Sequence, residues 1–139
     1  MKPSFVVDSS VALAWCFRDE ATPATRALLQ RMGGETALVP AWWFLELTNV
    51  IALAERKRRI TLEKVAEFIA LIQGFDLEID EEGARRAFTH LLPFCRTYQL
   101  TSYDALYLDL ALRRQVPLAT LDEPLRKAAE KLGVKLLGA

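Results

Sequence analysis

Apolar residues recur along this chain with two different periods. Short runs rich in β-branched and aromatic residues, bounded by polar residues, glycine or proline, are typical of strands. Apolar residues every three or four positions are typical of helices. The runs predict strands at residues 4–7, 37–39, 75–79, 117–121 and 134–137. The helical spacing predicts helices directly after residue 8 and at residues 21–32, 41–58, 61–74, 81–98, 102–114 and 124–132.

The order of these elements indicates the fold class. Strands that alternate with helices are typical of an α/β fold, in which helices cover both faces of a mainly parallel sheet. Within the 81–98 helix we expect a kink or break at Pro93, because proline lacks the N–H that an inner turn requires. No repeat, low-complexity segment or linker interrupts the pattern, so we expect one domain over residues 1–139.

Composition limits the classes of function. No apolar run approaches the roughly 18 residues that cross a membrane, and Asp8 interrupts the first run too early for a secretory signal. We therefore expect a soluble, cytoplasmic protein without membrane association. The 18 basic and 18 acidic residues cancel, which argues against coating nucleic acid by bulk charge. Cys16 and Cys95 are far apart in apolar surroundings, and we expect buried free thiols.

Three acidic residues stand at predicted strand ends or helix starts. Asp8 follows the first strand and Asp122 follows the fourth. Asp104 lies in the first turn of a helix that is capped by Thr101 or Ser102. An acid in such a position caps a helix or interacts with its dipole, so each residue alone has a structural explanation.

Glu46 interrupts a helix face that is otherwise apolar. Its neighbours three and four positions away include Trp42, Trp43 and Val50. A carboxylate on such a face is costly unless a cation or several donors meet it. Asn49 shares the face and can orient Glu46. The alternative is a helix rotated so that Glu46 faces solvent.

The four acids together indicate a metal site. In open α/β sheets, ligands bind outside the carboxyl ends of the strands, where these acids are expected. Two carboxylates about 4 Å apart repel by roughly 4 kcal/mol at an effective dielectric near 20, so a cluster of four requires a cation. Oxygen ligands favour magnesium, and we expect manganese to substitute for it. The predicted ligands are Asp8, Glu46, Asp104 and Asp122.

Four segments of the chain resemble a known family. They are Phe5-Val6-Val7-Asp8-Ser9-Ser10-Val11-Ala12, Glu46-Leu47-Thr48-Asn49, Ser102-Tyr103-Asp104-Ala105-Leu106-Tyr107 and Ala119-Thr120-Leu121-Asp122. With the four acids in the family's order and approximate spacing, the chain resembles PIN-domain nucleases over nearly its whole length. Within that family it is most similar to VapC-type toxins.

The resemblance implies a three-layer α/β/α fold and a magnesium-dependent endoribonuclease. It further implies a homodimer and a cognate VapB-like antitoxin that blocks the active site. Toxins of this kind cut transfer or ribosomal RNA and so halt translation. The residues that it assigns to the acidic catalytic site are Asp8, Glu46, Asp104 and Asp122, with Ser9, Asn49 and Thr120 as supporting polar residues.

The residue inventory favours a metal-assisted reaction. Metal-free RNA cleavage usually requires two acid–base groups that titrate near neutral pH, a role that histidine fills best. The sequence has one histidine, His90, so it cannot provide such a pair. We expect His90 to be structural or on the surface. A water activated by the metal would leave a 5′-phosphate and a 3′-hydroxyl. The basic runs at residues 56–59, 85–86 and 113–114 are either solvated helix ends or contacts to RNA phosphates.

Other functions fit the sequence less well. A phosphatase with an aspartyl nucleophile would place a second acid where Ser10 stands, and a phosphorelay receiver would have adjacent acids after its first strand. No glycine pattern of a phosphate-binding loop occurs. A catalytically silent PIN-like module that binds RNA or protein remains open. Trp15, Trp42 and Trp43 either pack in the core or stack on bases or an antitoxin.

Overall fold

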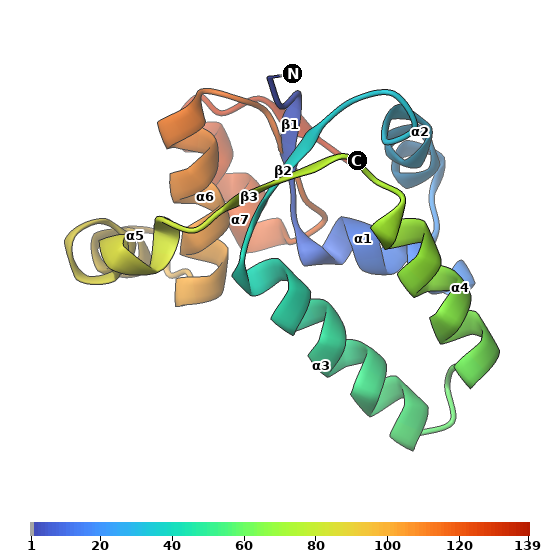
Figure 1. The fold of residues 1–139 in the computed structure, drawn as a ribbon. Coiled ribbons are helices and arrows are strands. Elements are labelled where there is room, and N and C mark those ends of the chain that lie inside the picture. Colours follow the sequence, from blue (N-terminus) through green and yellow to red (C-terminus); the bar gives the residue numbers. More distant parts are fainter. Residues whose placement is uncertain (1) are drawn as a thin grey trace.

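A five-stranded sheet forms the centre of the computed structural model, which describes residues 2–139 (Figure 1). The strands are β1 (Phe5–Val7), β2 (Ala37–Pro40), β3 (Leu77–Asp80), β4 (Leu118–Ala119) and β5 (Leu136–Leu137). The α-helices are α1 (Ser9–Cys16), α2 (Pro23–Arg31), α3 (Trp42–Arg56), α4 (Leu62–Gln73), α5 (Leu92–Tyr98), α6 (Ser102–Arg114) and α7 (Glu123–Lys131).

The sheet has the order β3-β2-β1-β4-β5, and each neighbouring pair is parallel. The chain moves outward from β1 to β3, crosses back to β4, and then continues to β5. Because crossovers between parallel strands are right-handed, this reversal puts α1, α2 and α4 on one face and α6 and α7 on the other (Figure 1). The predicted three-layer α/β/α architecture is confirmed.

The strand order reverses beside β1, the position at which open α/β sheets form a crevice for ligands. The neighbours of β1 are β2 and β4, whose connections leave toward opposite faces of the sheet. Such a switch point is where open α/β sheets bind ligands. Residues of β1 are fully buried, and the stretch of α6 from Ala105 to Ala111 is buried almost throughout. This switch point therefore stands on elements that packing holds in place.

Local sequence signals explain where most helices begin. Thr22, Thr61 and Thr101 each accept a hydrogen bond from a backbone N–H in the first turn of the helix that follows. Asp8 and Asp122 do the same for α1 and α7. These caps satisfy amides that would otherwise lack partners at the helix start.

The predicted 81–98 helix is wrong in its first half. Residues 83–86 form a 3₁₀ turn and residues 87–91 a π-helical turn, and only α5 is α-helical. Pro93 lies in the first turn of α5, where its missing N–H has no partner to lose. The break therefore comes before the proline rather than at it.

Two further expectations need correction or refinement. The cysteines are free as expected, but Cys16 and Cys95 are half-buried rather than buried. Burial raises the pKa of the Cys16 thiol to about 11, so it stays protonated.

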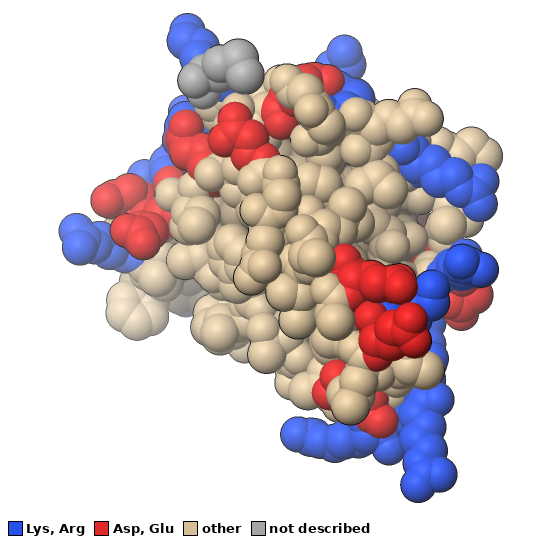
Figure 2. Space-filling view, turned by 45° about the vertical axis from the view of Figure 1, so that its right-hand side comes forward, with Lys and Arg blue, Asp and Glu red and all other residues tan. Residues whose placement is uncertain are grey.

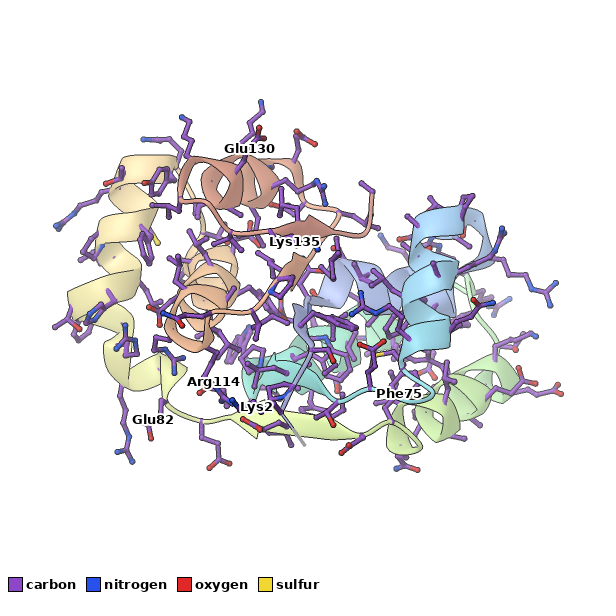
Figure 3. The ribbon with its side chains drawn as sticks, turned by 90° about the horizontal axis from the view of Figure 1, so that it is seen from above. Lys2, Phe75, Glu82, Arg114, Glu130 and Lys135 are labelled. Atoms are coloured by element: carbon purple, nitrogen blue, oxygen red, sulfur yellow. The ribbon has the colours of Figure 1, made fainter. Side chains whose placement is uncertain are left out.

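The second expectation concerns the basic pair at residues 113–114. In Figure 3, Arg114 reaches from the end of α6 to the edge strand β3, where it pairs with Glu78 at 2.6 Å.

Candidate active site

Asp8 directly follows β1, where the strand order reverses, and is 3% exposed. Its Oδ1 accepts hydrogen bonds from the Ser10 hydroxyl at 2.6 Å and the Val11 amide at 3.1 Å, and its Oδ2 accepts one from Thr120. Burial raises the pKa of Asp8 to about 6, the hydrogen bonds limit the rise, and the charge of Glu46 adds to it. Three donors, two from α1 and one from the loop after β4, orient the carboxylate, and none of them is cationic.

Thr120 connects Asp8 to the next acid. Its hydroxyl donates to Asp8 and accepts the backbone N–H of Asp122 at 3.0 Å. Gly138, with φ of +102°, passes so close that a Cβ there would lie 3.3 Å from the Thr120 carbonyl, and Arg126 donates to that carbonyl at 2.7 Å. The loop after β4 is thus fixed from three sides.

Asp104 and Asp122 form a pair of carboxyl groups. Asp122 caps α7 by accepting the Leu125 amide at 3.0 Å, and Asp104 stands in the first turn of α6 behind Thr101. Burial, a hydrogen bond with Asp122 and its charge raise the pKa of Asp104 to about 7, and the charges of Asp8 and Glu46 contribute. The charge of Asp122 thus opposes ionisation of Asp104, and a nearby cation would favour it.

Glu46, on α3, contacts side chains of α1 and α6. It accepts hydrogen bonds from the Tyr107 hydroxyl and, at 3.4 Å, from the Ser9 hydroxyl. Burial raises the pKa of Glu46, and these two donors oppose the rise. Tyr107 is almost fully buried, and its own pKa is raised by burial and by Glu46, so its hydroxyl keeps its proton and remains a donor. The alternative in which Glu46 faces solvent is not realised.

The donor set fits a hard divalent cation. Beyond burial, the charges of Asp122, Asp8 and Glu46 raise the pKa of Asp104, and that of Glu46 raises the pKa of Asp8, so the groups that act on these two acids include carboxylates but no histidine or cysteine. Oxygen-only donors of this kind suit magnesium or manganese. Within residues 2–139, no three His, Cys, Asp or Glu side chains are already closed into a metal-ligand arrangement.

The three predicted supporting residues differ in what they contact. Ser9 donates to Glu46 and Thr120 donates to Asp8, whereas Asn49 is exposed and lies beside Glu46 in the lining of the same hollow. Ser10 and Tyr107 had no predicted role at the acids. Tyr107 is three residues after Asp104, a spacing that puts both on one helix face and was the available signal.

Several basic residues proposed as RNA contacts have structural partners instead. Arg86 and Arg113 pair with Asp109 at 2.7 and 3.2 Å, and Arg113 also pairs with Asp80. Arg59 pairs with two acids of the 18–20 turn. Residues 56–58 are exposed at the end of the α3–α4 hairpin. In Figure 2, basic side chains project from the lower end of the molecule, where that hairpin turns in Figure 1.

The sequence profile of one family matches almost the whole chain. The PIN domain profile covers residues 5–131, from β1 to the end of α7, and so includes all four acids. The chain belongs to the PIN domain family. The matched residues span β1 to α7, the elements that carry the four acids.

Several solved structures share this fold. PAE2754 from Pyrobaculum aerophilum is 19% identical, with a TM-score of 0.65 over 98% of this chain and 85% of that one. VapBC2 from Rickettsia felis, bound to a promoter DNA fragment, is 14% identical, with a TM-score of 0.65 over 95% and 96%. FitAcB from Neisseria gonorrhoeae is 17% identical, with a TM-score of 0.60 over 95% of both chains. The search of curated protein sequences found no significant match.

The length and apolar character of the helices decide whether one of them could span a membrane. Within residues 2–139, none combines the length and the apolar character that spanning a bilayer requires.

Proposed function

We propose that this PIN domain is a magnesium-dependent endoribonuclease. The observation that supports the proposal is that, in addition to burial, Asp122, Asp8 and Glu46 all raise the pKa of Asp104, to about 7, from the start of α7, the start of α1 and from α3. The hydrogen-bond donors to Asp8, Glu46 and Asp122 are hydroxyl groups and backbone amides, so no cationic side chain among them offsets the repulsion between the carboxylates. A divalent cation would relieve this repulsion and be held by oxygen ligands.

The proposed reaction is hydrolysis of an RNA phosphodiester. When bound, a divalent cation supplies a nucleophile from water at neutral pH and neutralises charge on the leaving oxygen. Two carboxylates would hold the cation in one position. Hydrogen bonds from Ser10, Val11 and Thr120 fix Asp8, and one from Tyr107 fixes Glu46. Asp104, whose pKa lies near 7, is the carboxyl best placed to lose its proton when a cation arrives.

We further propose that the chain is the toxin of a toxin–antitoxin pair. One similar structure is a toxin–antitoxin complex from Klebsiella pneumoniae, 14% identical with a TM-score of 0.56 over 86% of this chain and 87% of that one, and another is VapBC2. By analogy, the partner is a VapB-like antitoxin that blocks the acidic site. The substrate would be transfer or ribosomal RNA in the cytoplasm, so that cleavage halts translation.

The α3–α4 hairpin offers a surface for this assembly. A groove of about 400 Å³ between the two helices is lined by apolar residues that include Leu47, Ile51, Phe68 and Ile72. We propose that an antitoxin segment or a second copy of the chain covers it. Light scattering of the free protein and of the complex with the antitoxin separates these two occupants. If the chain is a dimer in both and Ile51→Glu makes it a monomer, a second copy covers the groove. If Ile51→Glu leaves the dimer intact, the groove is not the dimer contact.

RNA cleavage tests the proposal directly. The purified chain is incubated with total cellular RNA in magnesium or in EDTA, beside Asp104→Asn and beside Glu130→Gln, an exposed acid on the outer side of α7. We expect fragments with 5′-phosphates only in magnesium, from the wild type and Glu130→Gln. Fragments with 2′,3′-cyclic phosphates would contradict the proposed chemistry. No cleavage with magnesium or manganese would favour the silent binding module.

A further inference from the structure

Two exposed aromatic rings stand beside the acidic site. Trp42, the first residue of α3, is 39% exposed, and Tyr103, in the first turn of α6, is 48% exposed. The rings lie nearly parallel, with an interplanar angle of 8° and centroids 5.2 Å apart. Large aromatic side chains at a surface retain a strong tendency to stack on a further planar group.

The rings are attached to the same helices as two of the acids. Trp42 is one helical turn before Glu46, a spacing that puts both side chains on one face of α3. Tyr103 directly precedes Asp104 on α6. The stacked pair therefore bridges the two helices at the edge of the proposed metal site and keeps a fixed relation to it.

The pair forms one wall of a hollow that opens at the site. The hollow has a volume of about 440 Å³, within the range of pockets that bind small planar ligands. Glu46 and Ser9, which contact each other in the site, also line it. Asn49 lies in the same lining, with an amide that both donates and accepts hydrogen bonds. The hollow therefore shares Glu46 and Ser9 with the acidic site.

The chemistry of the lining favours a neutral, planar occupant. No lysine or arginine lines the hollow, and Glu46 contributes negative charge. A phosphate is therefore disfavoured inside it. A nucleobase has a π-face for the aromatic pair and polar edges for Asn49, and its own phosphate would lie outside, toward the carboxylates.

We propose that Trp42, Tyr103 and Asn49 form a binding site for one unpaired nucleobase next to the scissile phosphate. This inference rests on the proposed ribonuclease function and names the residues that would position one nucleotide of its substrate. The base must leave its own stack to enter the hollow, so the same sequence in a duplex should be cleaved poorly.

The first test measures cleavage of an RNA oligonucleotide that contains a mapped cleavage site. Because stacking of a base on an aromatic side chain is worth about 1 to 3 kcal/mol, Trp42→Ala should lower kcat/KM roughly 5- to 100-fold, mainly through KM. Trp42→Phe should retain most of the activity. Phe88→Ala, which removes an aromatic ring that is 86% exposed on another segment, is the matched control and should leave kcat/KM unchanged.

Abasic substitutions identify the base. A set of oligonucleotides, each without one base near the cleavage site, is cut by the wild type and by Trp42→Ala. We expect the penalty of the variant to disappear for one abasic position and to persist for the others. An equal penalty at every position would overturn the proposal, as would a Trp42→Ala enzyme with unchanged kinetics. Unchanged kinetics with a lower mass by light scattering would assign the rings to a contact between copies.

A binding measurement separates this inference from the nuclease proposal. In EDTA, an adenylate tetranucleotide should quench the tryptophan fluorescence of the wild type, because Trp42 is exposed whereas Trp43 is fully buried. Trp42→Phe should remove most of the quenching. Quenching without any cleavage in magnesium would support the base site and overturn the nuclease function. Cleavage without quenching would leave the nuclease function and overturn the base site.

Discussion

Replacing Asp8 with asparagine should stabilise the metal-free protein at alkaline pH. Asp8 is 3% exposed and is surrounded by hydroxyl and amide donors, without a cationic side chain among its hydrogen-bond partners. Its ionised form is therefore poorly solvated. Asparagine has the same shape and no charge, and it keeps an oxygen to accept the Ser10 and Val11 hydrogen bonds.

The magnitude follows from the pKa of Asp8, which burial raises from 3.8 to about 6. This difference corresponds to about 3 kcal/mol. The unfolded chain releases its proton near pH 4 and the folded chain near pH 6, so the folded state binds more protons in between. Wild-type stability therefore falls as pH rises through this window. The asparagine variant escapes this loss.

Urea denaturation in EDTA at several pH values measures the effect. The unfolding free energy of Asp8→Asn minus that of the wild type should increase by about 2 to 3 kcal/mol between pH 4 and pH 8. Any hydrogen bond lost to the amide adds a constant offset and leaves this slope intact. The same difference at both pH values would refute the argument that burial penalises the Asp8 carboxylate.

Three further predictions concern the metal, the ion pairs and RNA. Magnesium should raise the melting temperature at pH 8 and have little effect at pH 5, because its ligands must lose their protons; equal shifts in differential scanning fluorimetry would contradict this. Asp109→Asn should cost about 2 to 4 kcal/mol of unfolding free energy in urea, because it removes the acid that pairs with Arg86 and leaves Arg113 with Asp80 alone; a cost below 1 kcal/mol would exclude a structural role. Replacing residues 56–58 with serine should flatten the salt dependence of RNA affinity in filter binding, and an unchanged slope would exclude the hairpin end as a phosphate contact.

The positions of three acids could be predicted because local sequence determines them. Asp8 and Asp122 follow buried strands and cap helices, and Asp104 lies in the first turn of α6. Parallel strands bring their carboxyl ends to one edge of the sheet, which is enough to predict the cluster. Glu46 was identifiable because a carboxylate is costly on an apolar helix face.

The partners of these acids could not be predicted, because they depend on tertiary packing. Tyr107 meets Glu46 across 61 residues of sequence, and Thr120 meets Asp8 across 112. The buried pairing of Arg113 with Asp80 likewise joins α6 to β3 and removes Arg113 from the residues available to RNA. The irregular turns at residues 83–91 carried no local signal that distinguishes them from an α-helix.

Calorimetric titration of manganese at pH 8 tests the central claim most directly, because it asks whether the acidic site is one cation site. The wild type and Glu130→Gln should bind the ion with the same affinity. Asp104→Asn should bind it at least about 10-fold more weakly, since a ligand of the cluster is lost. Equal affinities for the wild type and Asp104→Asn would contradict the account.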